Sequence, residues 1–206
     1  MNKNEKLNEI VFSFLEISIA ILFVYFTYTK QTFYAMQCLF FCLCMFIPCL
    51  IQLLFKMKIA PFMWLIYESF LVAHFILGEI LSFYITYKYY DIILHFSSAI
   101  CICLFGYSII HYYLDFSFYS FQIFFSFLFG LASEFFWEII EYAIDDIFHT
   151  NMQRYMKGNQ VFLGHFALTD TIKDMIVAVI GCFIFLLIIK INKIKNMKII
   201  KIEKNP

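Results

Sequence analysis

The chain contains 206 residues, of which 63% are hydrophobic, 22% aromatic and only 15% charged, and its mean hydropathy is +0.82. A soluble domain of this size carries about 25% charged residues, so the composition excludes an ordinary soluble enzyme, and the continuous apolar sequence excludes a disordered chain. Fifteen basic residues balance fifteen acidic ones, which excludes the strongly basic surface that binds nucleic acid. These values indicate an integral membrane protein.

Six apolar segments have the length of membrane-spanning helices, which need about 20 residues to cross the hydrocarbon core. A β-barrel would instead require short segments of alternating polarity, and these runs are continuous. We therefore predict an all-α polytopic bundle of about six transmembrane helices, forming a single membrane domain over residues 1–206. The predicted spans are roughly residues 10–28, 33–55, 59–87, 89–114, 119–148 and 168–191, followed by a basic tail at 192–206.

The distribution of basic residues predicts the orientation, because short cytoplasmic loops are enriched in lysine and arginine. With both termini in the cytoplasm, ten basic residues lie inside: Lys3, Lys6, Lys56, Lys58, Lys190, Lys193, Lys195, Lys198, Lys201 and Lys204. The lysines in the C-terminal tail could instead bind anionic lipid. Five then lie outside: Lys30, Lys88, Arg154, Lys157 and Lys173. We expect a multi-pass protein of the cytoplasmic membrane with its N- and C-termini inside.

Ionisable residues recur at helical spacing in the last three predicted spans. Asp91 and His95 are four residues apart, as are Asp170 and Asp174, so each pair shares one helix face. The span between them carries four acids within a stripe about 60° wide: Glu134, Glu138, Glu141 and Asp145. Small residues on these faces allow the helices to approach closely: Ser98, Gly130, Ala178 and Gly181. The pattern predicts a polar site between three helices.

The depth of these groups supports the same site. With a rise of about 1.5 Å per residue, Glu79, His95, Glu141 and Asp174 are each expected roughly 9–12 Å below the outer ends of their helices. An ionised acid in a membrane costs about 2.5–3.5 kcal/mol, so five would cost on the order of 15 kcal/mol. The few bases on that side cannot neutralise every acid, and we therefore expect a bound cation or protonated carboxyls.

Some ionisable residues fit a structural role better than a functional one. We expect Asp145 and Asp146 to be solvated at the end of their helix, and His149 and His165 to be solvated in the following loop. Glu16, Glu68 and His74 lie away from the cluster and receive no role.

Carboxylates with one imidazole suit divalent cations such as Mg²⁺, Mn²⁺, Fe²⁺ or Zn²⁺. We predict four ligands to such a metal ion: His95, Glu138, Glu141 and Asp174. Two further acids are predicted to act in catalysis, Asp91 by orienting an imidazole or binding substrate and Asp170 by accepting a hydrogen bond or serving as general base. In the outer loop, Arg154 and Lys157 could hold a phosphate of the substrate.

These residues carry a resemblance to a known family. The segments concerned contain Tyr90, Asp91, His95 and Phe96, then Glu138, Glu141 and Tyr142, then Asp170, Thr171, Asp174, Met175 and Gly181. Over about residues 89–185 the sequence resembles the bacterial YjdF-like membrane proteins, a family of undetermined function, and more remotely the VanZ-like proteins linked to glycopeptide resistance. The resemblance implies a bacterial protein. It also implies one further acid where Ala167 stands; if that acid were a ligand, this chain would have a reduced site or would use His165 in its place.

Three functions are compatible with this pattern. The first is a metal-dependent enzyme that acts on a lipid or lipid-linked substrate at the outer leaflet. The second is a proton or cation carrier or channel, since intramembrane acids serve as proton relays and cation sites. Against it, no inverted repeat is visible, and we expect no ionisable groups in the inner halves of the fourth and sixth spans. The third is a non-catalytic accessory protein whose acids only stabilise the bundle.

Overall fold

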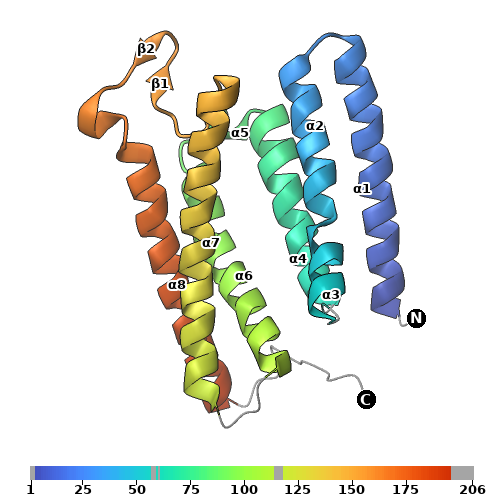
Figure 1. Cartoon of the computed structure of the whole chain (residues 1–206), viewed down its shortest axis with the longest axis vertical. Helices are drawn as coiled ribbons and strands as arrows, with labels where there is room; N and C mark the ends of the chain where they lie inside the picture. The colour runs from blue at the N-terminus through green and yellow to red at the C-terminus, as the bar shows by residue number, and fades with distance from the viewer. Residues whose placement is uncertain (1–2, 57–58, 60, 114–117, 196–206) are drawn as a thin grey trace. The chain divides into compact units, whose positions relative to one another are not determined.

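The computed structural model of the chain describes residues 3–56, 59, 61–113 and 118–195 (Figure 1). It divides into two compact units, residues 1–90 and residues 91–206. Six of the described helical segments are long and apolar enough to cross a membrane: Lys6–Tyr28, Thr32–Leu54, Pro61–Ile80, Tyr90–His111, Tyr119–Phe148 and Thr169–Ile191. The predicted all-α polytopic fold is confirmed.

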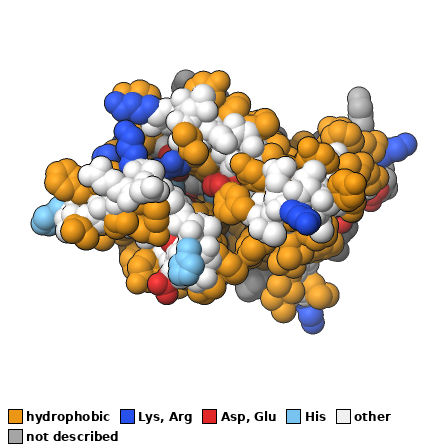
Figure 2. Space-filling model, turned by 90° about the horizontal axis from the view of Figure 1, so that it is seen from above, with side chains coloured by type: hydrophobic (Ala, Val, Ile, Leu, Met, Phe, Trp, Pro, Cys, Tyr) orange, Lys and Arg blue, Asp and Glu red, His pale blue; other side chains and the backbone are white. Residues whose placement is uncertain are grey.

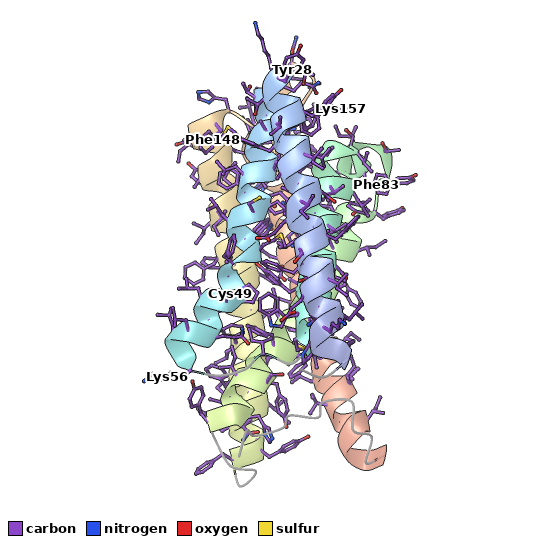
Figure 3. All side chains as sticks on the ribbon, turned by 90° about the vertical axis from the view of Figure 1, so that its right-hand side faces the viewer. Tyr28, Cys49, Lys56, Phe83, Phe148 and Lys157 are labelled. Carbon is purple, nitrogen blue, oxygen red and sulfur yellow. The ribbon has the colours of Figure 1, made fainter. Side chains whose placement is uncertain are left out.

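The first unit is an antiparallel arrangement of helices. In chain order it contains α1 (Lys3–Tyr28), α2 (Thr32–Met45), α3 (Ile47–Phe55), α4 (Pro61–Leu71), the π-helix η1 (Val72–Ile80) and the short α5 (Phe83–Thr86). Its core lies where α1 and α2 meet the α4–η1 segment, and Ile19, Phe41 and Phe75 are buried there. Tyr28 and Lys56, which end the first two spans, lie at opposite ends of this unit (Figure 3).

Two local breaks in the first unit were not predicted. The second span is interrupted at Phe46 because Pro48, in the first turn of α3, has no N–H to continue the helical hydrogen bonds. The third span ends at Ile80, so the predicted boundary at residue 87 is wrong. There Ser82 adopts a left-handed conformation with φ of 58°. The chain folds back because Gly78, which has no side chain, leaves room for the ring of Tyr84.

The second unit contains three long helices and a polar connection. Its elements are α6 (Tyr90–Tyr113), α7 (Tyr119–Phe148), the strands β1 (Met156–Lys157) and β2 (Gln160–Val161), the 3₁₀-helix η3 (Gly164–Phe166) and α8 (Thr169–Lys195). The strands pair as a small antiparallel hairpin between α7 and α8, which run side by side (Figure 1). The predicted span boundaries agree closely here. Lys58, Asp115 and the tail lysines from Lys198 onward lie outside the described residues.

Helix α7 has its polar side buried and its apolar side exposed. Seven of its residues, spaced three or four apart, form the buried face: Gln122, Ser126, Gly130, Glu134, Glu138, Glu141 and Asp145. Phe124, Phe136 and Ile140 are exposed on the opposite side. Hydrophobic side chains also form much of the surface in Figure 2. This polarity is the reverse of a helix in a soluble protein and suits a lipid surrounding.

Glycine and alanine residues bring α8 close to its neighbours. A side chain added at Gly181 would place its Cβ 2.6 Å from the carbonyl oxygen of Phe96 and 3.0 Å from the Cβ of Ala99. Gly130 of α7 faces Cys103 and Cys182 in the same way. The buried core of this unit includes residues from Ala99 to Tyr107 in α6 and from Ala178 to Ile189 in α8. The predicted role of small residues at these contacts is therefore confirmed.

Replacing Gly181 with alanine should destabilise the second unit, because the new methyl group meets backbone that side-chain motion cannot relieve. Overpacking of this kind costs about 1–3 kcal/mol. We expect a clear fall in the midpoint of thermal unfolding in detergent. Ile180→Ala is the matched control, since Ile180 is 49% exposed on the same helix. Equal stability of the Gly181→Ala and control proteins would contradict this packing.

Candidate functional site

Three helices of the second unit bring potential metal ligands together. His95 of α6, Glu138 of α7 and Asp174 of α8 are all buried, and each offers one ligand atom within 4.8 Å of the others. Neither carboxylate oxygen of Glu138 has a hydrogen-bond partner among the described residues, and the Thr171 hydroxyl lies nearby without reaching hydrogen-bond geometry. Buried polar groups are normally hydrogen-bonded, so the Glu138 oxygens are candidate ligand atoms.

A second group of acids adjoins the first. Asp91, Asp170 and Asp174 also offer oxygens within 4.8 Å of one another, and Asp174 belongs to both groups. Asp91 Oδ1 is 3.7 Å from His95 Nε2, which is itself 4.0 Å from Glu138 Oε1. The two groups therefore form one continuous polar cluster, and it contains five of the six residues predicted as ligands or catalytic acids.

Glu134 orients the histidine, a role that the sequence had suggested for Asp91. Its Oε2 is 3.1 Å from His95 Nδ1, and its Oε1 accepts a hydrogen bond of 2.6 Å from the Ser98 hydroxyl. With Glu134 ionised, Nδ1 donates to it, and Nε2 faces Asp91 and Glu138, where a neutral ring would present a lone pair to a metal ion. Metal-binding histidines are commonly held by a carboxylate in this way.

The loop after α7 brings Arg154 to the cluster. Its Nε donates to Asp91 Oδ2 at 3.1 Å and lies 3.6 Å from Asp170 Oδ2. The side chain is 29% exposed, so the guanidinium lies at the boundary between the buried acids and the surroundings of the loop. Arg154 therefore contacts both predicted catalytic acids. Its binding of a phosphate stays a prediction.

Asp145 fixes the start of this loop, and the expectation that it is solvated is wrong. It is buried and accepts hydrogen bonds from the Thr150 hydroxyl and from the backbone N–H groups of Met152 (2.7 Å) and Gln153 (2.9 Å). The Gln153 side chain in turn donates to Thr171 Oγ1 at 3.0 Å. The carboxylate is buried because it replaces the water that these N–H groups would otherwise need. Asp146 is exposed, as expected.

Two predicted site residues do not join the cluster. Glu141 is buried on the same face of α7, but its Oε1 accepts a hydrogen bond of 2.7 Å from Trp137 Nε1, and it belongs to neither ligand group. Lys157 is exposed in β1, toward the same end of the unit as Phe148 (Figure 3). His165 is also exposed, and no described contact links it to the acids in place of Ala167.

The remaining acids considered from the sequence lie in the first unit. Glu79 is the penultimate residue of η1, so its expected depth of several residues inside the helix is wrong. Glu68 is buried in α4, and neither of its oxygens has a hydrogen-bond partner among the described residues. His74 Nδ1 shares a hydrogen bond with the Tyr84 hydroxyl, and Glu16 is partly exposed.

A second buried histidine was missed. His111, at the end of α6 opposite Asp91, is 8% exposed, and its Nδ1 lies 3.0 Å from Gln122 Oε1 of α7. Its ring stacks on that of Tyr107, with an interplanar angle of 12°. The statement that this half of the span lacks ionisable groups is therefore wrong. The sequence signal was the position of Gln122, which lies about three helical turns from Glu134 on the same face of α7 and so extends the polar face toward His111.

Substituting Asp145 with asparagine should loosen the loop, because the amide nitrogen would face a backbone N–H that now donates to a carboxylate oxygen. Hydrogen bonds to a charged group contribute about 1.5–3 kcal/mol. We expect faster trypsin cleavage after Arg154 and Lys157, measured by mass spectrometry. Asp146→Asn on the adjacent exposed position is the control, and equal cleavage of the two variants would contradict the role of Asp145.

The comparisons with known proteins identify a membrane protein family. A family model described as a predicted membrane protein, DUF2238, matches residues 10–194. No curated protein and no solved structure matches the chain. Because the matched region covers nearly the whole sequence, including both units, the chain belongs to the predicted membrane protein family DUF2238.

Proposed function

We propose that this protein is a metal-dependent membrane enzyme and that His95, Glu138 and Asp174 bind its divalent metal ion. The observation that carries the proposal is the buried carboxylate of Glu138, which has no hydrogen bond among the described residues and offers an oxygen within 4.8 Å of an imidazole nitrogen and a second carboxylate. Leaving a charged group unpaired in a membrane interior is costly, and a cation held by these three residues would offset that cost.

The ligand set fits a catalytic metal better than a structural one. Structural zinc sites are closed by four protein ligands, whereas catalytic sites keep a position open for water or substrate. Three protein ligands from three helices leave such a position. One imidazole with two carboxylates suits Mn²⁺, Fe²⁺ or Zn²⁺, and Mg²⁺ with more water. A bound ion of this kind would lower the pKa of a coordinated water and polarise an ester or phosphoryl oxygen.

The residues next to the three ligands would bind the substrate and act on it. Asp91 and Asp170 lie beside the three ligands and are the candidates for general base and hydrogen-bond acceptor. Arg154 and Lys157 are the candidates to recognise an anionic group, since arginine binds phosphate through paired hydrogen bonds. A cluster enclosed by helices of membrane-spanning length favours a lipid or lipid-linked substrate over a water-soluble one.

We further propose that the protein is YjdF-like and resides in the bacterial cytoplasmic membrane, with both termini in the cytoplasm. The motif residues around His95, Glu138 and Asp174 support this assignment, as does the distribution of basic residues. In this orientation the cluster opens toward the outer leaflet, where Arg154 would meet the substrate head group.

Purified protein should bind one divalent ion per chain at the His95 site, and His95→Ala should lower the affinity by about 10- to 100-fold or more. Elemental analysis and isothermal titration with Mn²⁺ and Zn²⁺ measure this. His165→Ala, at an exposed loop histidine, is the control and should bind like wild type. Absence of stoichiometric metal, with no gain in melting temperature across divalent ions, would refute the proposal.

The enzymatic part of the proposal has its own readout. Reconstituted protein, incubated with Mn²⁺ and a bacterial lipid extract that contains lipid-linked precursors, should release a head group detectable by mass spectrometry. Glu138→Gln and Asp170→Asn should lose this release, while Asp146→Asn should retain it. Metal binding without any change in the lipid mixture would favour a carrier or accessory role.

The buried pair of His111 and Gln122 favours one second candidate, a proton or cation carrier. These residues extend the polar face of α7 to the end of the unit opposite Asp91. Vesicles containing the protein would then show pH or cation flux that is lost in His111→Phe and in Glu138→Gln. Flux equal to that of empty vesicles would exclude this candidate.

A further inference from the structure

The acids around Asp174 divide into two overlapping sets of three. His95, Glu138 and Asp174 form the first set, and Asp91, Asp170 and Asp174 form the second. We propose that the second set is a site for a second divalent cation, that Asp174 bridges the two ions, and that the guanidinium of Arg154 takes the second position when that ion is absent. This inference rests on the proposed function and extends it from one ion to two.

Arg154 already places a positive charge beside two of the three acids of the second set. Its Nε lies 3.1 Å from Asp91 Oδ2 and 3.6 Å from Asp170 Oδ2, so a positive group stands between two acids that belong to the second set. The two carboxylates come from different helices, α6 and α8. Among the described residues, Asp170 forms an ion pair with Arg154, and Asp91 forms ion pairs with Arg154 and His95.

The third member of the set, Asp174, points independently to a ligand. Asp174 is 3% exposed, and its carboxylate forms no hydrogen bond with any of the described residues. Arg154 pairs with Asp91 and Asp170 rather than with Asp174. A carboxylate at the junction of two ligand sets, buried and without a hydrogen bond, has the position of a bridging ligand. Metal pairs in enzymes lie about 3.5–4 Å apart.

The charge of the cluster, with its carboxylates ionised, is compatible with more than one divalent ion. Five carboxylates surround a single guanidinium and a single imidazole: Asp91, Glu134, Glu138, Asp170 and Asp174. One divalent ion at the first set leaves an excess of negative charge even with Arg154 in place. Exchange of the guanidinium for a second divalent ion adds one positive charge. This reduces the excess negative charge of the cluster, which is costly in a membrane interior.

The loop is built so that Arg154 can leave while the acids stay. Asp91, Asp170 and Asp174 lie on helices, whereas Arg154 lies in the connection between α7 and β1 and is 29% exposed. Its backbone is left-handed, with φ of 49°, which is unfavourable for a residue with a side chain. The hydrogen bonds of Asp145 and Gln153 hold the preceding residues, so a rotation of the Arg154 side chain frees the acids without opening the helices.

Titration with Mn²⁺ alone tests this inference in the full-length purified protein. Arg154→Met removes the charge while keeping most of the side-chain length, and Arg154→Gln serves if that variant is unstable. Either variant should raise the affinity for the second ion by at least about tenfold, because the competing guanidinium charge is gone. The affinity for the first ion should change by less. Electron paramagnetic resonance should then show two exchange-coupled Mn²⁺ ions in place of one isolated six-line signal. Adding Asp170→Asn to the same variant should abolish the coupling.

The outcomes separate the two proposals. If wild type binds one ion that His95→Ala removes, but the Arg154 variants still bind one uncoupled ion, the second site is refuted and the first stands. A second ion that persists unchanged in the Asp170→Asn double variant also refutes it. If neither wild type nor the Arg154 variants bind Mn²⁺, both proposals fall.

Discussion

The cost of exposing a carboxylate to lipid is the constraint on which the second unit depends. One face of helix α7 carries four acids and two uncharged polar residues, and that face is buried against α6 and α8. The opposite face presents phenylalanine and isoleucine. Since no other arrangement hides the acids, the rotation of α7 about its axis is fixed, and the polar groups of its neighbours are drawn to the same interior.

Different turns of α7 then have different tasks. Glu134 holds the ring of His95, Glu138 presents its unpaired oxygens to the cluster, and Asp145 holds the loop that carries Arg154. Between them, Gly130 and Gly181 let the three helices approach closely enough for their side chains to meet. The cluster is therefore a product of helix packing as much as of the acids themselves.

Much of this arrangement was predictable from the sequence. Apolar length predicted the six spans, and spacings of three or four residues predicted that Asp91 with His95, and Asp170 with Asp174, share faces. What failed depended on local backbone or on exact partners. The turn at Ser82 lies in a continuous apolar run, so hydropathy could not reveal it. Asp145 at a helix end looks solvated until the following loop folds over it, and periodicity cannot decide which of Glu134 and Asp91 holds His95.

We propose that the oxygens of Glu138, which have no hydrogen bond among the described residues, face a metal ion held with His95 and Asp174. An experimental structure of the protein with Mn²⁺, with anomalous diffraction recorded at the manganese edge, tests it most directly. We expect an anomalous peak within about 2.0–2.3 Å of a ligand atom from each of these three residues. A map with no peak there, in which Glu138 instead pairs with another protein group, would contradict it.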